Sequence, residues 1–284
     1  MINLPYGSGM TTVIALARAA HPLPTAAVTG VSVLLAAVAG NCAGTCVLLA
    51  VAVLVGQLTV GWSNDLLDAA ADAEVGRFSK PLAAGEVSRQ LVGWCLAGAV
   101  PATVILSLAV GWRPGSAYLF AVGCGWLYNA WLKGGWLSWL PYSVAFAALP
   151  AVATLALPQP RWPAGWAIAA AALLGGAANL TNTLPELAAR NPAGYRGLPD
   201  RIGSRPSLLL AGALLIVATG CVAFGPAGSP AGRAWLGLSA EIVLVLIGIP
   251  LLWRRAASRA PFYAMLGALL VPAVLIVLAG HRLR

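Results

Sequence analysis

The chain has 284 residues, of which 60% are hydrophobic and only 9% are Asp, Glu, Lys or Arg. Soluble domains carry about a quarter charged residues, so this composition excludes an ordinary soluble protein. The net charge of +9 does not indicate nucleic-acid binding, because the basic residues are scattered over short connections instead of clustering on one helix face.

Apolar stretches of roughly 17 to 25 residues recur along the chain, each long enough to cross about 30 Å of hydrocarbon as a helix. They predict an all-α integral membrane protein with about nine transmembrane helices, in a single domain over residues 1–284. In chain order, the expected spans are 22–40, 43–62, 91–111, 116–132, 137–157, 163–182, 207–226, 235–253 and 261–280. The first twenty residues show no cleavable signal pattern, so we expect the amino terminus to stay in the cytosol.

The basic residues of the connections predict the orientation. An odd number of spans puts the two termini on opposite sides, and the 17 Lys and Arg residues then divide 12 to 5 between the sides. The richer side is expected in the cytosol, because positive residues are retained there. We therefore expect a multi-pass protein of the cell membrane whose two long connections, about 63–90 and 183–206, both face the cytosol.

Acidic residues concentrate in these two long connections. Seven of the eight lie there: Asp65, Asp68, Asp72, Glu74 and Glu86 in the first, and Glu186 and Asp200 in the second. The two connections also share a layout of Asn and acids at a helix end followed by a Gly-rich basic stretch. This likeness suggests a weak internal repeat, roughly 10–130 and 131–260.

Three aspartates share one helix face at the end of the second expected span. Asp65, Asp68 and Asp72 stand at i, i+3 and i+7, and Asn64 lies on the same side, one turn before Asp68. Like charges at this spacing repel each other, a cost that a structural role would not require. Mg²⁺ removes the repulsion, takes hard oxygen ligands and commonly bridges to substrate phosphates. The three carboxylates are therefore predicted metal ligands.

Basic side chains follow where a phosphate group would need them. Arg77 and Lys80 come after the acidic helix, Lys133 follows the fourth span, and Arg196 and Arg201 belong to the second long connection. Lys and Arg make strong charge-assisted contacts with phosphate oxygens. The positive-inside bias also explains each of these residues taken singly, so both interpretations stay open.

A second polar face begins near the end of the sixth expected span. Asn179, Asn182, Thr183, Glu186 and Arg190 fall within about 100° of one another around a helix. The face either completes a site for a substrate headgroup or caps a helix. We favour the site, because it mirrors the first long connection.

Four segments together resemble the UbiA-type intramembrane prenyltransferases. NDLLDAAAD matches the N-D-x-x-D-x-x-x-D pattern of that family, and KPLAAGEVS resembles the stretch that follows it. YNAWLK at 128–133 resembles the family's Tyr and Lys after its fourth helix, and AGYRGLPDRIG resembles the end of its second acidic loop. The likeness spans nearly the whole chain and implies the family's fold, with helices around a central cavity.

The resemblance implies a Mg²⁺-dependent enzyme that ionises a prenyl diphosphate and passes the allylic cation to a lipophilic or aromatic acceptor in the lipid bilayer. The expected catalytic residues are Asp65, Asp68, Asp72 and Lys133, and the expected metal ligands are the same three aspartates with Glu186. The expected substrate-binding residues are Asn64, Arg77, Lys80, Asn182, Glu186, Arg190, Arg196 and Arg201.

The second acidic run departs from the family pattern. Thr183 and Arg190 stand at two places that are usually acidic, and only Glu186 remains. Two arrangements are therefore open: Glu186 helps to hold a second Mg²⁺, or Arg190 meets the diphosphate directly.

Two other functions stay open from the sequence. A terpene cyclase of the same family would act on the prenyl diphosphate alone. A secondary transporter would bind ions through intramembrane carboxylates, and Glu241 in the eighth expected span is its best candidate. The clustering of the other acids at the membrane edge favours the enzyme.

Overall fold

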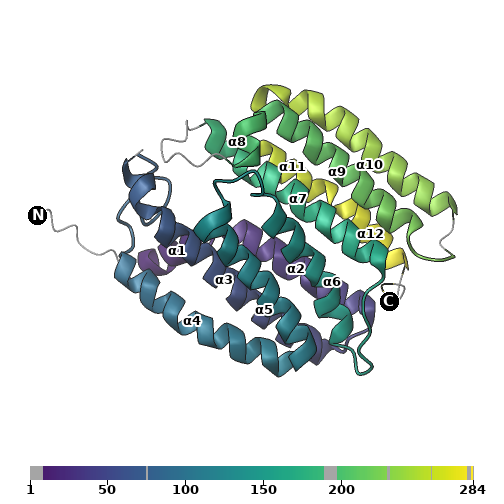
Figure 1. Cartoon of the computed structure of the whole chain (residues 1–284), viewed down its shortest axis with the longest axis horizontal. Helices are drawn as coiled ribbons and strands as arrows, with labels where there is room; N and C mark the ends of the chain where they lie inside the picture. The colour runs from purple at the N-terminus through teal and green to yellow at the C-terminus, as the bar shows by residue number, and fades with distance from the viewer. Residues whose placement is uncertain are drawn as a thin grey trace, which may run out of the picture.

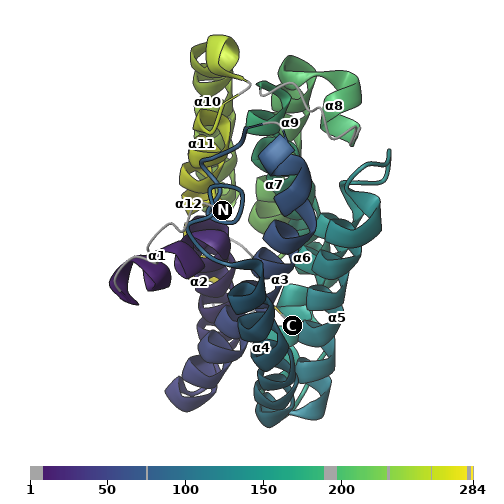
Figure 2. The ribbon, with the colours of Figure 1, turned by 90° about the vertical axis from the view of Figure 1, so that its left-hand side faces the viewer.

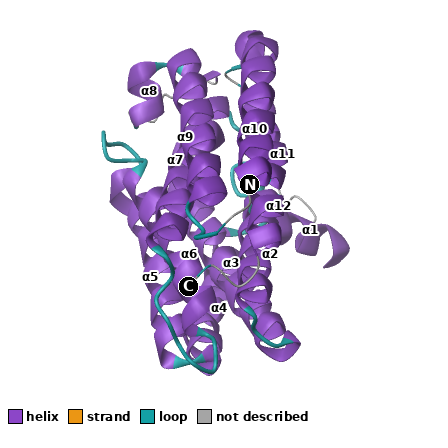
Figure 3. Ribbon diagram, turned by 90° about the vertical axis from the view of Figure 1, so that its right-hand side faces the viewer, coloured by secondary structure: helices purple, strands orange, loops and turns teal. Residues whose placement is uncertain are grey.

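The computed structural model describes residues 9–74, 76–188, 197–228, 231–256, 258–279 and 283, with the backbone alone at 185, 186, 188 and 231. All regular secondary structure in this part of the chain is helical, with no strand (Figure 3). The helices are α1 (Gly9–Ala19), α2 (Pro22–Ala39), α3 (Ala43–Glu74), α4 (Arg89–Val110), α5 (Trp112–Leu127), α6 (Leu140–Leu155), α7 (Gly165–Ala188), α8 (Leu198–Ile202), α9 (Ser204–Phe224), α10 (Ala231–Leu252), α11 (Ala260–Ala268) and α12 (Leu270–Ala279). A π-helical turn η1 (Tyr128–Leu132) continues α5, and a 3₁₀ turn η2 (Trp253–Arg255) continues α10.

Seven stretches of the described chain are long and apolar enough to cross a membrane. They are Pro22–Ala39, Ala43–Glu74, Arg89–Val110, Gly165–Leu184, Ser204–Phe224, Gly232–Arg255 and Ala260–Leu278. In Gly232–Arg255 only 11% of the most apolar window is buried inside the protein, so its apolar surface is available to lipid. The predicted all-α membrane architecture is confirmed. The number of nine crossings stays a prediction, because α5 and α6 are shorter than these seven stretches.

The helices form two groups that meet along α6 and α7 (Figures 1 and 2). In the first group, each of α2 to α6 packs against the next, and α6 returns to α2, so the five helices close a ring. In the second group, α9 lies between α7 and α10, while α11 packs on α7 and α12 packs on α9 and α10. The predicted internal repeat over residues 10–130 and 131–260 stays a prediction.

Each group has its own apolar core. Leu49 and Val53 of α3, Tyr118 of α5 and Val152 of α6 are buried together in the first. The Tyr118 hydroxyl donates to the Val53 carbonyl oxygen at 2.8 Å, so the phenol does not leave a buried donor unpaired. The second core joins α7, α9, α10 and α11.

Several helix boundaries differ from the sequence prediction. Helix α3 continues to Glu74, although its apolar span was expected to end at 62, because its polar end is covered by other segments. Helices α1 and α8 were not predicted. The last expected span is broken at Leu269, three residues before Pro272, whose nitrogen has no proton to donate to the preceding turn.

We expect the two long connections to lie in the cytosol. In a variant whose five native cysteines are replaced, Phe78→Cys and Arg205→Cys should resist membrane-impermeant thiol reagents in intact cells and react after lysis. Both native side chains are exposed. Arg161→Cys is the matched control, because its exposed side chain lies in a connection expected outside, so it should react in intact cells. Labelling in the opposite order would show that the orientation is reversed.

Candidate functional site

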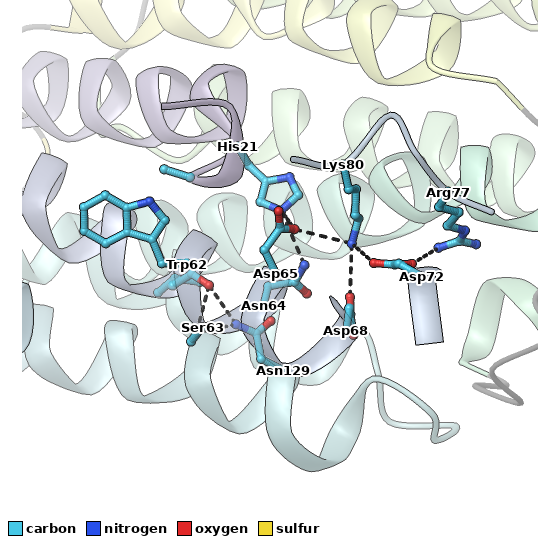
Figure 4. Close-up of polar contacts among 12 residues, drawn as sticks. His21, Trp62, Ser63, Asn64, Asp65, Asp68, Asp72, Arg77, Lys80 and Asn129 are labelled. Carbon is cyan, nitrogen blue, oxygen red and sulfur yellow. Dashed lines mark hydrogen bonds and ion pairs between the residues drawn. The ribbon is translucent and has the colours of Figure 1, made fainter. Parts of the chain in front are cut away.

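Three carboxylates lie on one buried face at the polar end of α3 (Figure 4). Asp65 is 2% exposed, and Asp68 and Asp72 are each 4% exposed. Their spacing puts them on the same side of the helix, as the sequence predicted. Carboxylates buried this deeply need compensating positive charge, so the partners of these three define the site.

Lys80 provides charge to all three aspartates. Its Nζ lies 3.4 Å from Asp65 Oδ1, 3.3 Å from Asp68 Oδ2 and 2.7 Å from Asp72 Oδ2. Arg77 adds a second cation, with Nη1 at 3.2 Å from Asp72 Oδ1. Both residues fold back over α3 because the chain turns at Gly76, whose φ of +70° is readily adopted only by glycine.

Burial disfavours the charged form of Lys80, but the carboxylates of Asp68, Asp65 and Asp72 outweigh that effect and raise the pKa of Lys80. The ion pairs of Lys80 with the aspartates therefore stabilise the fold fully below the unfolded-state pKa of 10.5. Their contribution is lost only as the pH rises through the higher folded-state pKa. Lys80 is therefore a fixed positive charge at physiological pH.

Lys133, which directly follows η1, contacts one of the same carboxylates, Asp68. Its side chain is 8% exposed, and its Nζ donates to Asp68 Oδ2 at 2.5 Å and to Asn64 Oδ1 at 3.4 Å. Asn129 fastens η1 to α3, because its Nδ2 donates to the Val60 carbonyl and to Ser63 Oγ, each at 2.9 Å. A π-helical turn is a common device at functional sites, and here it carries Lys133 towards Asp68.

The site balances three carboxylates with three cations. Lys80, Lys133 and Arg77 all contact the aspartates, and Asp68 is shared by the two lysines. Within the described ranges, no three His, Cys, Asp or Glu side chains form a group ready to hold a metal ion. The predicted ligation of Mg²⁺ by Asp65, Asp68 and Asp72 therefore stays a prediction.

The second polar face is joined to the site's surroundings through tyrosines. Asn182 Nδ2 donates to the Tyr142 hydroxyl at 3.3 Å, and the Tyr142 ring meets the Tyr128 ring of η1 edge to face, with 4.9 Å between centroids. The exposed Arg201 side chain stacks on the Trp136 ring, with its Cζ 4.8 Å from the ring centroid, and its contact with the diphosphate stays a prediction. The Glu186 side chain and all of Arg190 and Arg196 lie outside the described residues.

His21 contacts the site but was missed in the sequence. Its Nε2 lies 3.1 Å from Asp65 Oδ1. Three residues earlier, Arg18 forms an ion pair with Glu86, which belongs to the connection that carries Lys80. The available signal was that His21 is one of only two histidines in the chain and directly precedes a proline at the start of a span. No periodicity links it to Asp65, which is 44 residues away.

Several solved structures have a similar fold. A UbiA homologue from Archaeoglobus fulgidus bound to GPP and Mg²⁺ is 15% identical with a TM-score of 0.69, and the alignment covers 93% of this chain and 98% of that one. The apo UbiA homologue from Aeropyrum pernix K1 is 14% identical with a TM-score of 0.68, covering 96% and 98%. The structure of a digeranylgeranylglyceryl phosphate synthase is 14% identical with a TM-score of 0.66, covering 95% and 98%. No match was found among curated proteins.

The sequence match agrees with the fold. A model of the UbiA prenyltransferase family matches residues 9–268, a range that contains α1 to α11, the three aspartates, Lys80 and Lys133. The chain therefore belongs to the UbiA prenyltransferase family.

Proposed function

We propose that the protein transfers a prenyl group from an isoprenoid diphosphate to a lipophilic or aromatic acceptor within the membrane, and that the reaction depends on Mg²⁺. The observation that carries the proposal is the convergence of three buried carboxylates on one cation at the end of α3. Relatives of the same fold bound to GPP or DMAPP with Mg²⁺ support it. Family membership also favours an enzyme over the transporter hypothesis.

The donor set fits a hard divalent cation. Asp65, Asp68 and Asp72 offer only carboxylate oxygens, which Mg²⁺ prefers, and they already surround the Lys80 ammonium. These three residues would hold the ion once Lys80 has moved away from them. The bound ion would supply positive charge that neutralises diphosphate oxygens.

The three cationic side chains then bind the diphosphate. Once the aspartates have another partner, Lys80, Lys133 and Arg77 become available to phosphate oxygens, with which they make strong charge-assisted contacts. The bond between the prenyl C1 and the diphosphate oxygen breaks, and its electron pair stays on that oxygen. Fixed positive charges stabilise the departing diphosphate more than the intact ester, which lowers the barrier.

The remaining steps need an apolar environment and a nucleophile. The resulting allylic cation forms a bond with a nucleophilic atom of the acceptor, which then loses a proton. Apolar helix walls hold the prenyl tail and exclude water that would quench the cation. A lipophilic acceptor fits a site at the end of a membrane-spanning helix, because such a molecule reaches it from the bilayer.

Product analysis tests this function directly. Purified protein is incubated with labelled prenyl diphosphates of several lengths, each alone and with a panel of quinone-precursor, aromatic and lipid acceptors, and the products are identified by mass spectrometry. We expect a prenylated acceptor and released diphosphate only when both substrates are present. A cyclic hydrocarbon formed from the diphosphate alone would identify a terpene cyclase instead.

We expect the second polar face to act through Arg190 rather than through a second metal, because its motif retains only one carboxylate. Arg190→Ala should raise the KM for the prenyl diphosphate about tenfold, since a charge-assisted contact with phosphate is lost. Glu186→Gln should lower kcat/KM by less than about fivefold, because the main metal ligands stay in place. A loss in Glu186→Gln as large as that in Asp68→Asn would show that Glu186 is a metal ligand.

A further inference from the structure

His21, in the turn before α2, has a left-handed backbone conformation. His21 has φ 52° and ψ 70°, and it is the only residue other than glycine with positive φ in the described chain. Such left-handed conformations are uncommon for residues with a side chain. The Nε2 atom of this residue meets the first aspartate of α3 (Figure 4).

The contact assigns the proton on the imidazole. His21 Nε2 lies 3.1 Å from Asp65 Oδ1 and 3.4 Å from Asn64 Nδ2. A carboxylate can only accept, so the shorter contact requires a proton on Nε2, which donates to Asp65. The Asn64 amide is at the longer distance and directs its oxygen to Lys133.

The neighbouring segment fixes His21 against α3. Trp62 Nε1 donates to the Leu16 carbonyl at 3.0 Å, and the Gly61 Cα lies so close to the Ala20 backbone that a Cβ there would collide with it. Arg18 Nη2 donates to the Ser79 carbonyl at 2.9 Å, which ties the same segment to the connection carrying Lys80. The segment that precedes His21 is therefore held both against α3 and against the connection that carries Lys80.

We propose that His21 is a positioning residue that orients the Asp65 carboxylate for the cation. Both His21 and Lys80 contact Oδ1, and among the described residues Asp65 Oδ2 takes part in no hydrogen bond, so that oxygen is left for a metal ion. Hydrogen bonds to metal-ligating side chains fix their direction and raise metal affinity. His21 acts through Asp65 without touching substrate, and this role rests on the proposed function.

Binding of Mn²⁺ in the absence of any prenyl substrate tests the proposal, with electron paramagnetic resonance to count free ions. His21→Gly keeps the left-handed turn and removes the donor, so its affinity should fall about 10- to 100-fold, the usual effect of losing such a partner. His21→Gln keeps an N–H donor of similar reach and should stay within about threefold of the unmodified protein. In turnover, His21→Gly should raise the Mg²⁺ concentration for half-maximal rate more than it lowers the rate at saturating Mg²⁺.

If His21 only shaped the turn, His21→Gly should bind Mn²⁺ more tightly than His21→Gln, because glycine adopts this turn more easily than glutamine. His21→Gly binding Mn²⁺ as tightly as the unmodified protein would overturn the proposal while leaving the metal site intact. Leu23→Ala is the matched control: it changes an exposed side chain two residues after His21 and should keep the affinity within about twofold. Absence of Mn²⁺ binding in the unmodified protein would instead remove the proposed metal site, and this inference with it.

Discussion

Asp68→Asn should lower turnover by about 10²- to 10³-fold, the usual effect of removing one group that stabilises charge in a transition state. Asp68 is the carboxylate shared by Lys80 and Lys133, and it is 4% exposed. Asparagine keeps the shape of the side chain but offers a neutral oxygen, which is a poor partner for a hard cation. Initial rates of prenyl transfer at saturating Mg²⁺ measure the effect.

Two further variants make this result interpretable. Removing the partner of a buried charge costs about 3–5 kcal/mol, so Asp68→Asn also threatens folding through Lys133. Asp65→Asn is gentler, because Lys80 keeps Asp68 and Asp72, and it should lose turnover to a similar degree. Glu74→Gln is the matched control: its exposed side chain lies on the same helix end, and it should keep turnover within about twofold.

The thermal midpoint in detergent separates loss of chemistry from loss of structure. We expect Asp65→Asn to be inserted, with a thermal midpoint close to that of the unmodified protein, while its turnover is reduced about 10²- to 10³-fold. Near-normal turnover in both aspartate variants, with normal insertion, would exclude the carboxylates from catalysis and would require another site for the diphosphate.

Removing divalent cations with EDTA should abolish turnover completely. Without a divalent ion, Lys80, Lys133 and Arg77 stay bound to the aspartates and are not available to the diphosphate. Addition of Mg²⁺ or Mn²⁺ in excess of the chelator should restore the full rate, which shows that the protein itself was not damaged. EGTA at a concentration that removes Ca²⁺ but leaves Mg²⁺ free is the control and should have no effect.

Mn²⁺ binding by a Lys80 variant tests whether Lys80 competes with the metal ion for the carboxylates. If Lys80 must leave the carboxylates before metal binds, Lys80→Met should bind Mn²⁺ more tightly than the unmodified protein. Its KM for the diphosphate should rise, because a cation that contacts phosphate is lost. Full turnover in metal-free buffer would contradict the central assumption of the proposed function, whatever the behaviour of Lys80.

The family and the acidic face could be predicted from the sequence because both depend on local patterns. Apolar length predicted the membrane helices, and the i, i+3, i+7 spacing placed Asp65, Asp68 and Asp72 on one side of α3. Basic residues were also expected close to these aspartates, and the structure brings Arg77, Lys80 and Lys133 to them. The stacking of Arg201 on Trp136 could not be predicted, because it joins two separate connections.

Only the tertiary structure decided which side chains meet. The Gly76 turn returns Lys80 to the carboxylates, η1 brings Lys133 to Asp68 across 65 residues, and the turn at His21 brings it to Asp65 across 44 residues. A helix period relates residues within one element, whereas these contacts depend on the dihedral angles of loops and on helix packing. The sequence therefore determined the membrane helices and the carboxylate face, and the packing of α1, α3 and η1 determined the pairing of each carboxylate.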